Sequence, residues 1–133
     1  GGQLAGKTVA VWGLAFKPGT DDIREAPALV LIDRLLAGGA RLQVHDPEAM
    51  DNVRRQYGNR LSYYQHGEDA LDGADALAIM TEWKQFVHPD FADMRSRMRS
   101  AVIFDGRNIY SPERIQKAGF TYYSIGRAPV RPG

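Results

Sequence analysis

The chain has 133 residues, the size of one ordinary domain, and is long enough to bury a hydrophobic core without cross-links. It is 44% hydrophobic and 25% charged, as globular proteins are, and its lack of cysteine excludes disulfides, thiolate metal sites and a cysteine nucleophile. A net charge of +1 without a basic stripe argues against nucleic-acid binding, and no apolar run approaches the roughly 20 residues of a membrane span.

The first half of the chain is predicted to alternate strands and helices. Residues 8–13 (TVAVWG) are apolar, partly β-branched and end in glycine, which is typical of a buried strand. Residues 26–37 carry an apolar stripe, and Pro27 suits the first turn of a helix there. The further elements expected in this half are a strand over residues 41–45, a helix over 48–57 and a short edge strand over 61–64.

The second half continues the alternation. Residues 75–80 (DALAIM) and 101–105 (AVIFD) predict two more strands. Ser111 and Pro112 are the N-cap and first residue expected of a helix that ends at Ala118. The other expected elements are a brief helix over 66–71, helical turns over 83–86 and 90–98, and a last strand over 120–125. The pattern predicts a three-layer, Rossmann-like α/β fold, with five or six parallel strands, 8–13 central, and helices on both faces.

The chain is predicted to form one domain over residues 1–133. Residues 1–6 are expected to be a linker and residues 128–133 a loose tail. The N-terminus lacks the charged and apolar regions of a signal peptide, and the absence of cysteine is compatible with a reducing compartment. We therefore expect a cytoplasmic location and no membrane partner.

Three polar clusters each follow a predicted strand. They are residues 13–25 (GLAFKPGTDDIRE), 81–83 (TEW) and 105–108 (DGRN). In an open parallel sheet, ligands bind beyond the carboxyl ends of the strands, so these clusters should converge there. Lys17 and Arg24, brought to a helix N-terminus by a long loop, suit an anion such as a diphosphate. Equally, the loop's aspartates could cap the helix and pair with both cations.

A dinucleotide site is not indicated at the first strand. The fingerprint G-x-G-x-x-G needs clustered glycines, whereas Gly13 is followed by LAF and the next glycine is Gly19. Asp46, at the end of the second strand, could mimic a ribose-binding acid, but with Pro47 it more simply forms a turn. We interpret the chain as a Rossmann-like sheet without a dinucleotide site of its own.

Arg107 is the clearest single ligand group, because its guanidinium fork matches phosphate or vicinal hydroxyls. The alternative is an ion pair with Asp105 or Glu82. Trp83 could stack on a ligand, but core packing is the commoner role. The three histidines, His45, His66 and His88, lie on separate elements without metal-ligand spacing, and we assign them no site.

Seven short motifs carry a resemblance to a known family. They are GLAFKP (13–18), TDD (20–22), REAP (24–27), TEW (81–83), DGRNIY (105–110), GF (119–120) and SIGR (124–127). Together they resemble the C-terminal domain of the UDP-glucose/GDP-mannose dehydrogenase family, and the resemblance runs from about residue 6 to 127. The sequences of these motifs resemble the UDP-glucose branch of the family more than the GDP-mannose branch.

The resemblance implies that a nucleotide sugar's C6 alcohol is oxidised to a carboxylate while two NAD are reduced. Family members are homo-oligomers with an N-terminal NAD-binding domain and a central helical region that holds a catalytic cysteine and pairs subunits. By position, Phe16, Lys17 and Arg107 match the family's contacts to the sugar nucleotide. Arg24 matches the arginine that reaches NAD on the other domain.

The chain departs from the family in having neither the cysteine nor the dinucleotide fingerprint. It is therefore expected to bind UDP-glucose or a related nucleotide sugar, without catalytic residues or metal of its own and without activity alone. Two alternatives stay open. The chain could be a freestanding nucleotide-sugar-binding module with a regulatory role, or an autonomous NAD-binding domain that uses Asp46.

Overall fold

The computed structural model describes residues 5–15, 17–24, 26–126 and 129–131. Its centre is a six-stranded sheet in the order β3-β2-β1-β4-β5-β6, and every neighbouring pair is parallel. The strands are β1 (Thr8–Trp12), β2 (Arg41–His45), β3 (Ser62–Tyr63), β4 (Ala76–Ile79), β5 (Val102–Asp105) and β6 (Thr121–Ser124). The strand order reverses between β1 and β4, so a topological switch point lies at their carboxyl ends, the usual place for a ligand.

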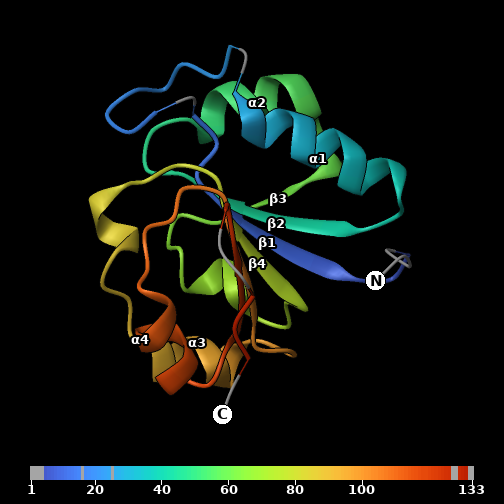
Figure 1. The fold of residues 1–133 in the computed structure, drawn as a ribbon. Helices are drawn as coiled ribbons and strands as arrows, with labels where there is room; N and C mark the ends of the chain where they lie inside the picture. Colours follow the sequence, from blue (N-terminus) through green and yellow to red (C-terminus); the bar gives the residue numbers. More distant parts are fainter. Residues whose placement is uncertain (1–4, 16, 25, 127–128, 132–133) are drawn as a thin grey trace.

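Helices lie on both faces of the sheet (Figure 1). One face carries α1 (Pro27–Ala37) and α2 (Met50–Tyr57), and the other carries α3 (Phe91–Arg97) and α4 (Pro112–Lys117). Three single turns complete the described elements: η1 (Gly58–Arg60), η2 (Asp69–Leu71) and η3 (Lys84–Phe86). Among the described residues, no helix is long and apolar enough to cross a membrane.

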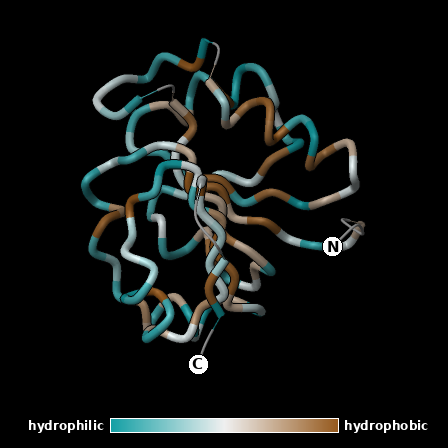
Figure 2. Tube along the Cα trace, viewed as in Figure 1, coloured by the Kyte–Doolittle hydropathy of each residue, from teal (hydrophilic) through white to brown (hydrophobic). Residues whose placement is uncertain are grey.

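Each face of the sheet has its own hydrophobic core. Val11 and Ile32 belong to the cluster under α1 and α2, while Leu77 and Ile103 belong to the cluster under α3 and α4. Figure 2 shows hydrophobic residues concentrated along the strands and hydrophilic residues along much of the outer loops. The rigid sheet therefore fixes where each strand ends, and with it the loops that follow.

The start of α4 follows the predicted capping chemistry. The Ser111 hydroxyl accepts a hydrogen bond from the Arg114 amide at 3.2 Å, and Pro112 occupies the first turn. In α3, the Asp90 carboxylate accepts from the Asp93 amide in the same way. These caps satisfy amides that the helix itself leaves unpaired, so they fix where both helices begin.

The predicted fold class and the central position of β1 are confirmed. Most boundaries are one or two residues shorter than expected, and the helix expected over residues 66–71 is only the single turn η2. The expectation of a loose tail is wrong for residues 129–131: Val130 exchanges two backbone hydrogen bonds with Tyr122. Pairing there satisfies backbone groups on the free edge of β6, an edge that would otherwise be open.

Candidate functional site

Asp46 joins three elements at the carboxyl end of the sheet. It is 1% exposed and follows β2. One carboxylate oxygen accepts from the amides of Glu48 and Ala49, both at 2.8 Å, before α2. The other accepts from the two amides that follow β1 and from the Trp83 indole. A buried carboxylate is stable only when its oxygens are satisfied in this way.

The second oxygen of Asp46 holds the start of the loop between β1 and α1. Leu14 donates its amide at 2.7 Å and Ala15 at 3.3 Å, and the Trp83 Nε1 donates at 3.2 Å. Both oxygens of Asp46 are thus engaged inside the protein and are not free to bind a ribose. The structure favours the turn interpretation of Asp46 over the dinucleotide one.

Gly13 packs directly against the segment that follows β4. Its φ of +96° lies in the left-handed region, and a Cβ at this position would come within 2.5 Å of the Thr81 amide nitrogen. The buried Thr81 hydroxyl also donates to the Ala15 carbonyl at 2.8 Å. The glycine therefore permits a close approach of two protein segments, and the space that a pyrophosphate would need beside this turn is filled.

Asp105 organises the turn after β5 as Asp46 organises the turns after β1 and β2. It is 2% exposed, and it accepts from the amide of Arg107 at 2.9 Å and that of Ile109 at 2.7 Å. The Tyr122 hydroxyl donates to it at 2.6 Å. Its side chain therefore shapes the backbone that carries Arg107 and does not pair with the Arg107 guanidinium.

Asn108 ties this turn to the end of β6. It has a φ of +55°, in the left-handed region that asparagine tolerates better than most residues. Its side-chain amide donates to the Ile125 carbonyl and accepts from the Ile125 amide, both at 2.9 Å. The turn over residues 105–108 is therefore held by the buried Asp105 and by Ile125, the residue that follows β6.

Arg107 forms an ion pair with Glu82, the residue that follows Thr81. The Arg107 Nε lies 2.5 Å from a Glu82 carboxylate oxygen, and both side chains are over a third exposed. Among the described residues, none accepts a hydrogen bond from the two terminal nitrogens of Arg107. Glu82 thus orients the guanidinium while leaving its outer edge available to a ligand.

The loop between β1 and α1, drawn in blue at the upper left of Figure 1, carries the other predicted site residues. Lys17 is exposed. The Arg24 side chain is 87% exposed and makes a two-pronged contact to Asp22, with distances of 3.0 and 2.8 Å. These bonds lower the pKa of Asp22 to about 2. Phe16 lies outside the described residues.

The three predicted clusters meet at the same edge of the sheet. Thr81 links the second cluster to the first through Ala15, and Glu82 links it to the third through Arg107. Lys17 follows β1 and Arg107 follows β5, two strands away, so the ends of these strands are roughly 10 Å apart. The loops that carry these two cations therefore leave the sheet at the same edge.

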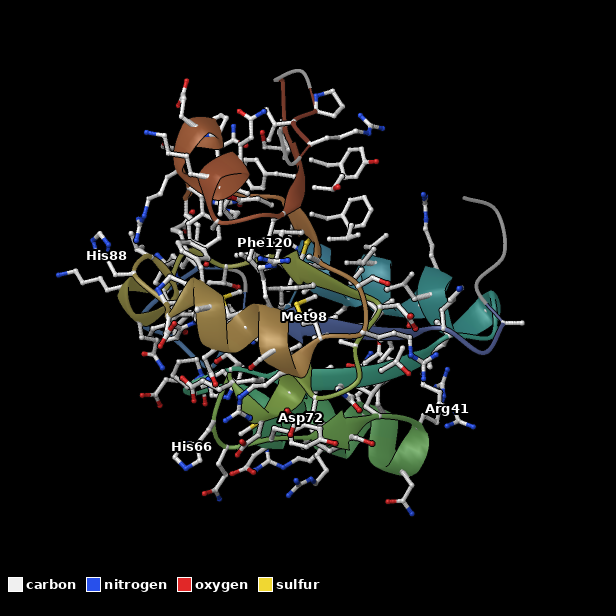
Figure 3. All side chains as sticks on the ribbon, turned by 90° about the horizontal axis from the view of Figure 1, so that it is seen from below. Arg41, His66, Asp72, His88, Met98 and Phe120 are labelled. Carbon is white, nitrogen blue, oxygen red and sulfur yellow. The ribbon has the colours of Figure 1, made fainter. Side chains whose placement is uncertain are left out.

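Two buried carboxylates were not predicted as the frame of this site. Both Asp46 and Asp105 come directly after an apolar strand, a place where an acidic side chain can satisfy several backbone amides. Trp83 packs against the core and donates to Asp46, which favours its structural role. His66 and His88 lie well apart (Figure 3), and no group of metal ligands occurs among the described residues.

Comparison with known proteins identifies relatives of this arrangement. The profile described as "UDP-glucose/GDP-mannose dehydrogenase family, UDP binding domain" matches residues 10–112. The UDP-glucose 6-dehydrogenase of Pseudomonas aeruginosa is 50% identical over 131 residues, which cover 95% of this chain and 29% of that protein. The chain therefore spans less than a third of the curated relatives that it matches.

Solved structures give the same picture. A UDP-glucose dehydrogenase from Pyrobaculum islandicum superposes with a TM-score of 0.79 at 35% identity, over 96% of this chain and 27% of that one. A UDP-D-ManNAc dehydrogenase from Pyrococcus horikoshii superposes with a TM-score of 0.75 at 29% identity, over 94% of this chain and 27% of that one. The relatives thus share the fold while differing in the sugar that their names record.

Proposed function

The chain belongs to the UDP-glucose/GDP-mannose dehydrogenase family and carries its C-terminal, UDP-binding domain; on this premise, we propose that it binds UDP-glucose within a longer, NAD-dependent dehydrogenase that oxidises UDP-glucose to UDP-glucuronate. The choice of UDP-glucose is supported by the 50% identity to a protein of that name. A relative named for UDP-D-ManNAc makes other nucleotide sugars the main competitors.

Arg107 is the observation that carries the proposal. Its Nε is held by Glu82, and its two outer nitrogens have no hydrogen-bond acceptor among the described residues. A guanidinium held on one edge presents the other as a planar fork, which suits a diphosphate or a pair of sugar hydroxyls. We assign Phe16 and Lys17 to the same ligand, on the loop that follows β1, two strands from β5 in the sheet.

The first turn of this sheet does not fit a dinucleotide. Thr81 occupies the space beside Gly13, and the oxygens of Asp46 are already hydrogen-bonded. NAD, if the parent enzyme uses it, is thus held by another domain. Arg24 is our candidate contact to that NAD, because its side chain extends into solvent and is held by Asp22. No catalytic residue is assigned within this chain.

The remaining features of the parent enzyme follow from the family resemblance. We propose that a preceding NAD-binding domain and a central region with the catalytic cysteine complete it. We also propose that it is a cytoplasmic homo-oligomer. The gene sequence upstream of Gly1 tests this directly. A freestanding regulatory module would have no such domains before it, whereas the proposed enzyme must encode both.

Calorimetric titration of this chain tests the ligand assignment. We expect UDP and UDP-glucose to bind with a 1:1 stoichiometry, and we expect GDP-mannose and NAD to bind much more weakly. Binding of NAD alone would favour the autonomous NAD-binding alternative. In the parent enzyme, kcat/KM for UDP-glucose should exceed that for UDP-N-acetylmannosamine; the reverse order would transfer the proposal to that sugar.

A further inference from the structure

The two faces of strands β4, β5 and β6 are covered to different degrees. On the face toward α3 and α4, Leu77 and Ile103 are fully buried. On the opposite face, Phe104 is 46% exposed and stacks on Tyr123 with ring centroids 4.9 Å apart. The register aligns Ala78, Phe104 and Tyr123 across the three strands, so these residues form one row on the less covered face.

An apolar groove of about 890 Å³ lies between this row and α1. Leu31 and Leu35 of α1 form its wall, and residues of β1, β4, β5 and β6 and of the segments that flank these strands line the rest of it. On this side α1 and α2 pack over β1 and β2, and among the described helices none lies over β4–β6. Lys7 and Asp75 border the groove where the strands begin.

An uncovered half-face is unusual for this kind of sheet. All-parallel sheets occur almost only with both faces covered, since their strands are apolar on both sides. Here the strands are apolar on both sides, as the neighbouring residues Ile103 and Phe104 show on opposite faces of β5. A contiguous exposed apolar surface of this kind marks an interaction site.

We propose that this groove is the docking site of an amphipathic helix from the remainder of the parent enzyme. The inference rests on the part of the proposed function that places this domain in a longer chain. Relatives carry the matched region as only 29% of their length, so ample chain exists to supply such a helix. Lys7, immediately before β1, borders the groove, so the first strand of the domain begins at the end of the groove.

The shape of the surface favours a helix over other occupants. An added strand would need a free sheet edge, but Val130 already pairs with Tyr122 on β6. A second copy's flat sheet would meet the raised wall of α1. Strands of four residues are about 13 Å long, so a helix of two to three turns covers them. Its apolar stripe would face Phe104, and an acidic residue would suit Lys7.

Single-cysteine labelling tests this docking, because the chain contains no cysteine of its own. Phe104→Cys reports on the groove. Val30→Cys is the matched control, since Val30 is 56% exposed on α1 and does not line the groove. Maleimide labelling of each site is followed by peptide mass spectrometry in this chain and in the parent enzyme. Ile125→Cys, at a groove residue that is 64% exposed, is the second reporter if Phe104→Cys fails to fold.

We expect labelling at position 104 to be about tenfold or more slower in the parent enzyme than in this chain, because a docked helix must open first. Labelling at position 30 should be equal in both. Equal rates at position 104 would refute the docking site while leaving UDP-glucose binding unaffected. A rate at 104 that falls with increasing concentration of this chain would identify a second copy as the occupant and would equally refute the proposal.

Discussion

Arg107 is the residue on which the proposed recognition of the sugar nucleotide depends most. A hydrogen bond between charged groups contributes about 1.5–3 kcal/mol. In the parent enzyme, Arg107→Ala should therefore weaken UDP-glucose binding about 10- to 150-fold, since each 1.4 kcal/mol is a factor of ten. NAD binding should change little. Arg107→Lys should restore little affinity, because an ammonium lacks the planar fork.

Arg24→Ala is the matched control for this experiment, and it should weaken NAD instead of UDP-glucose. Titrations of both ligands with both variants measure the difference, and thermal unfolding verifies that each variant folds. Equal losses of both ligands in both variants would show that the arginines act on the structure of the domain and not on separate ligands.

The contact between Asp22 and Arg24 should titrate in strong acid. Hydrogen bonds from the Arg24 side chain and amide lower the pKa of Asp22 from 3.8 to about 2. Because the folded-state pKa is the lower one, the contact favours the folded loop above the unfolded pKa and is lost as the pH falls through about 2. Carboxyl chemical shifts from NMR should show this midpoint, and in Arg24→Ala the midpoint should move toward 3.8. An unchanged midpoint would show that another group holds Asp22.

The sequence indicated some of the contacts around Arg107 and missed others. Arg107 was expected to contact phosphate or to pair with an acid, and the structure supplies Glu82 as that acid. The role of Asp105 could not be predicted, because it depends on Tyr122 from β6 reaching a carboxylate 17 residues earlier in the chain. Short-range patterns carry no information on such a contact.

At the scale of elements, the buried Asp46 should stabilise the junction of β1, α2 and the segment after β4. An Asp46→Asn substitution turns an amide NH₂ toward donors that need an acceptor. We expect it to lower the free energy of unfolding by about 2–4 kcal/mol, because buried donors lose charged partners. Urea unfolding measures the loss. Asp51→Asn, the same change at an exposed position of α2, should stay within about 0.5 kcal/mol of the wild type. Equal effects of the two substitutions would contradict this role.

The turn after β1 should tolerate no side chain at Gly13. Gly13→Ala places a Cβ within 2.5 Å of the Thr81 backbone at a φ of +96°, so a backbone segment must move. We expect a loss of about 3–5 kcal/mol in the free energy of unfolding. Gly73→Ala is the control, since Gly73 has a φ of +74° and open space around its Cβ position. It should lose only the backbone term of about 1–2 kcal/mol. If both variants lose the same amount, the close approach of Thr81 does not matter.

The elements themselves were largely predictable because their signals are local. Ser111 and Pro112 identify the start of α4, and the apolar run after Lys7 identifies β1. The prediction of a loose C-terminal tail missed the pairing of Val130 with Tyr122, because this pairing is not a local feature of the sequence. Prolines at positions 129 and 132 indicated irregular chain, and they give no sign of whether such chain pairs with an edge.

For the whole molecule, the parallel sheet with β1 at its centre was predicted from the alternation of strands and helices. The uncovered half-face of β4–β6 did not follow from it. Phe104 lies in an apolar run that is typical of a buried strand, yet its exposed fraction is 46%. Burial depends on which helices the chain supplies to each face, and no helix for this face was recognisable among the predicted elements.

The molecule as a whole should bind without catalysing. The 133 residues include no cysteine for a covalent step, and the Gly13 turn has no room for a dinucleotide. We therefore expect this chain, mixed with NAD and UDP-glucose, to give no increase in NADH absorbance, whereas calorimetry on the same sample should record UDP-glucose binding. The parent enzyme is the positive control for turnover. An absorbance rise that scales with the concentration of this chain, persists after further purification and disappears in Arg107→Ala would show that the domain is itself a catalyst.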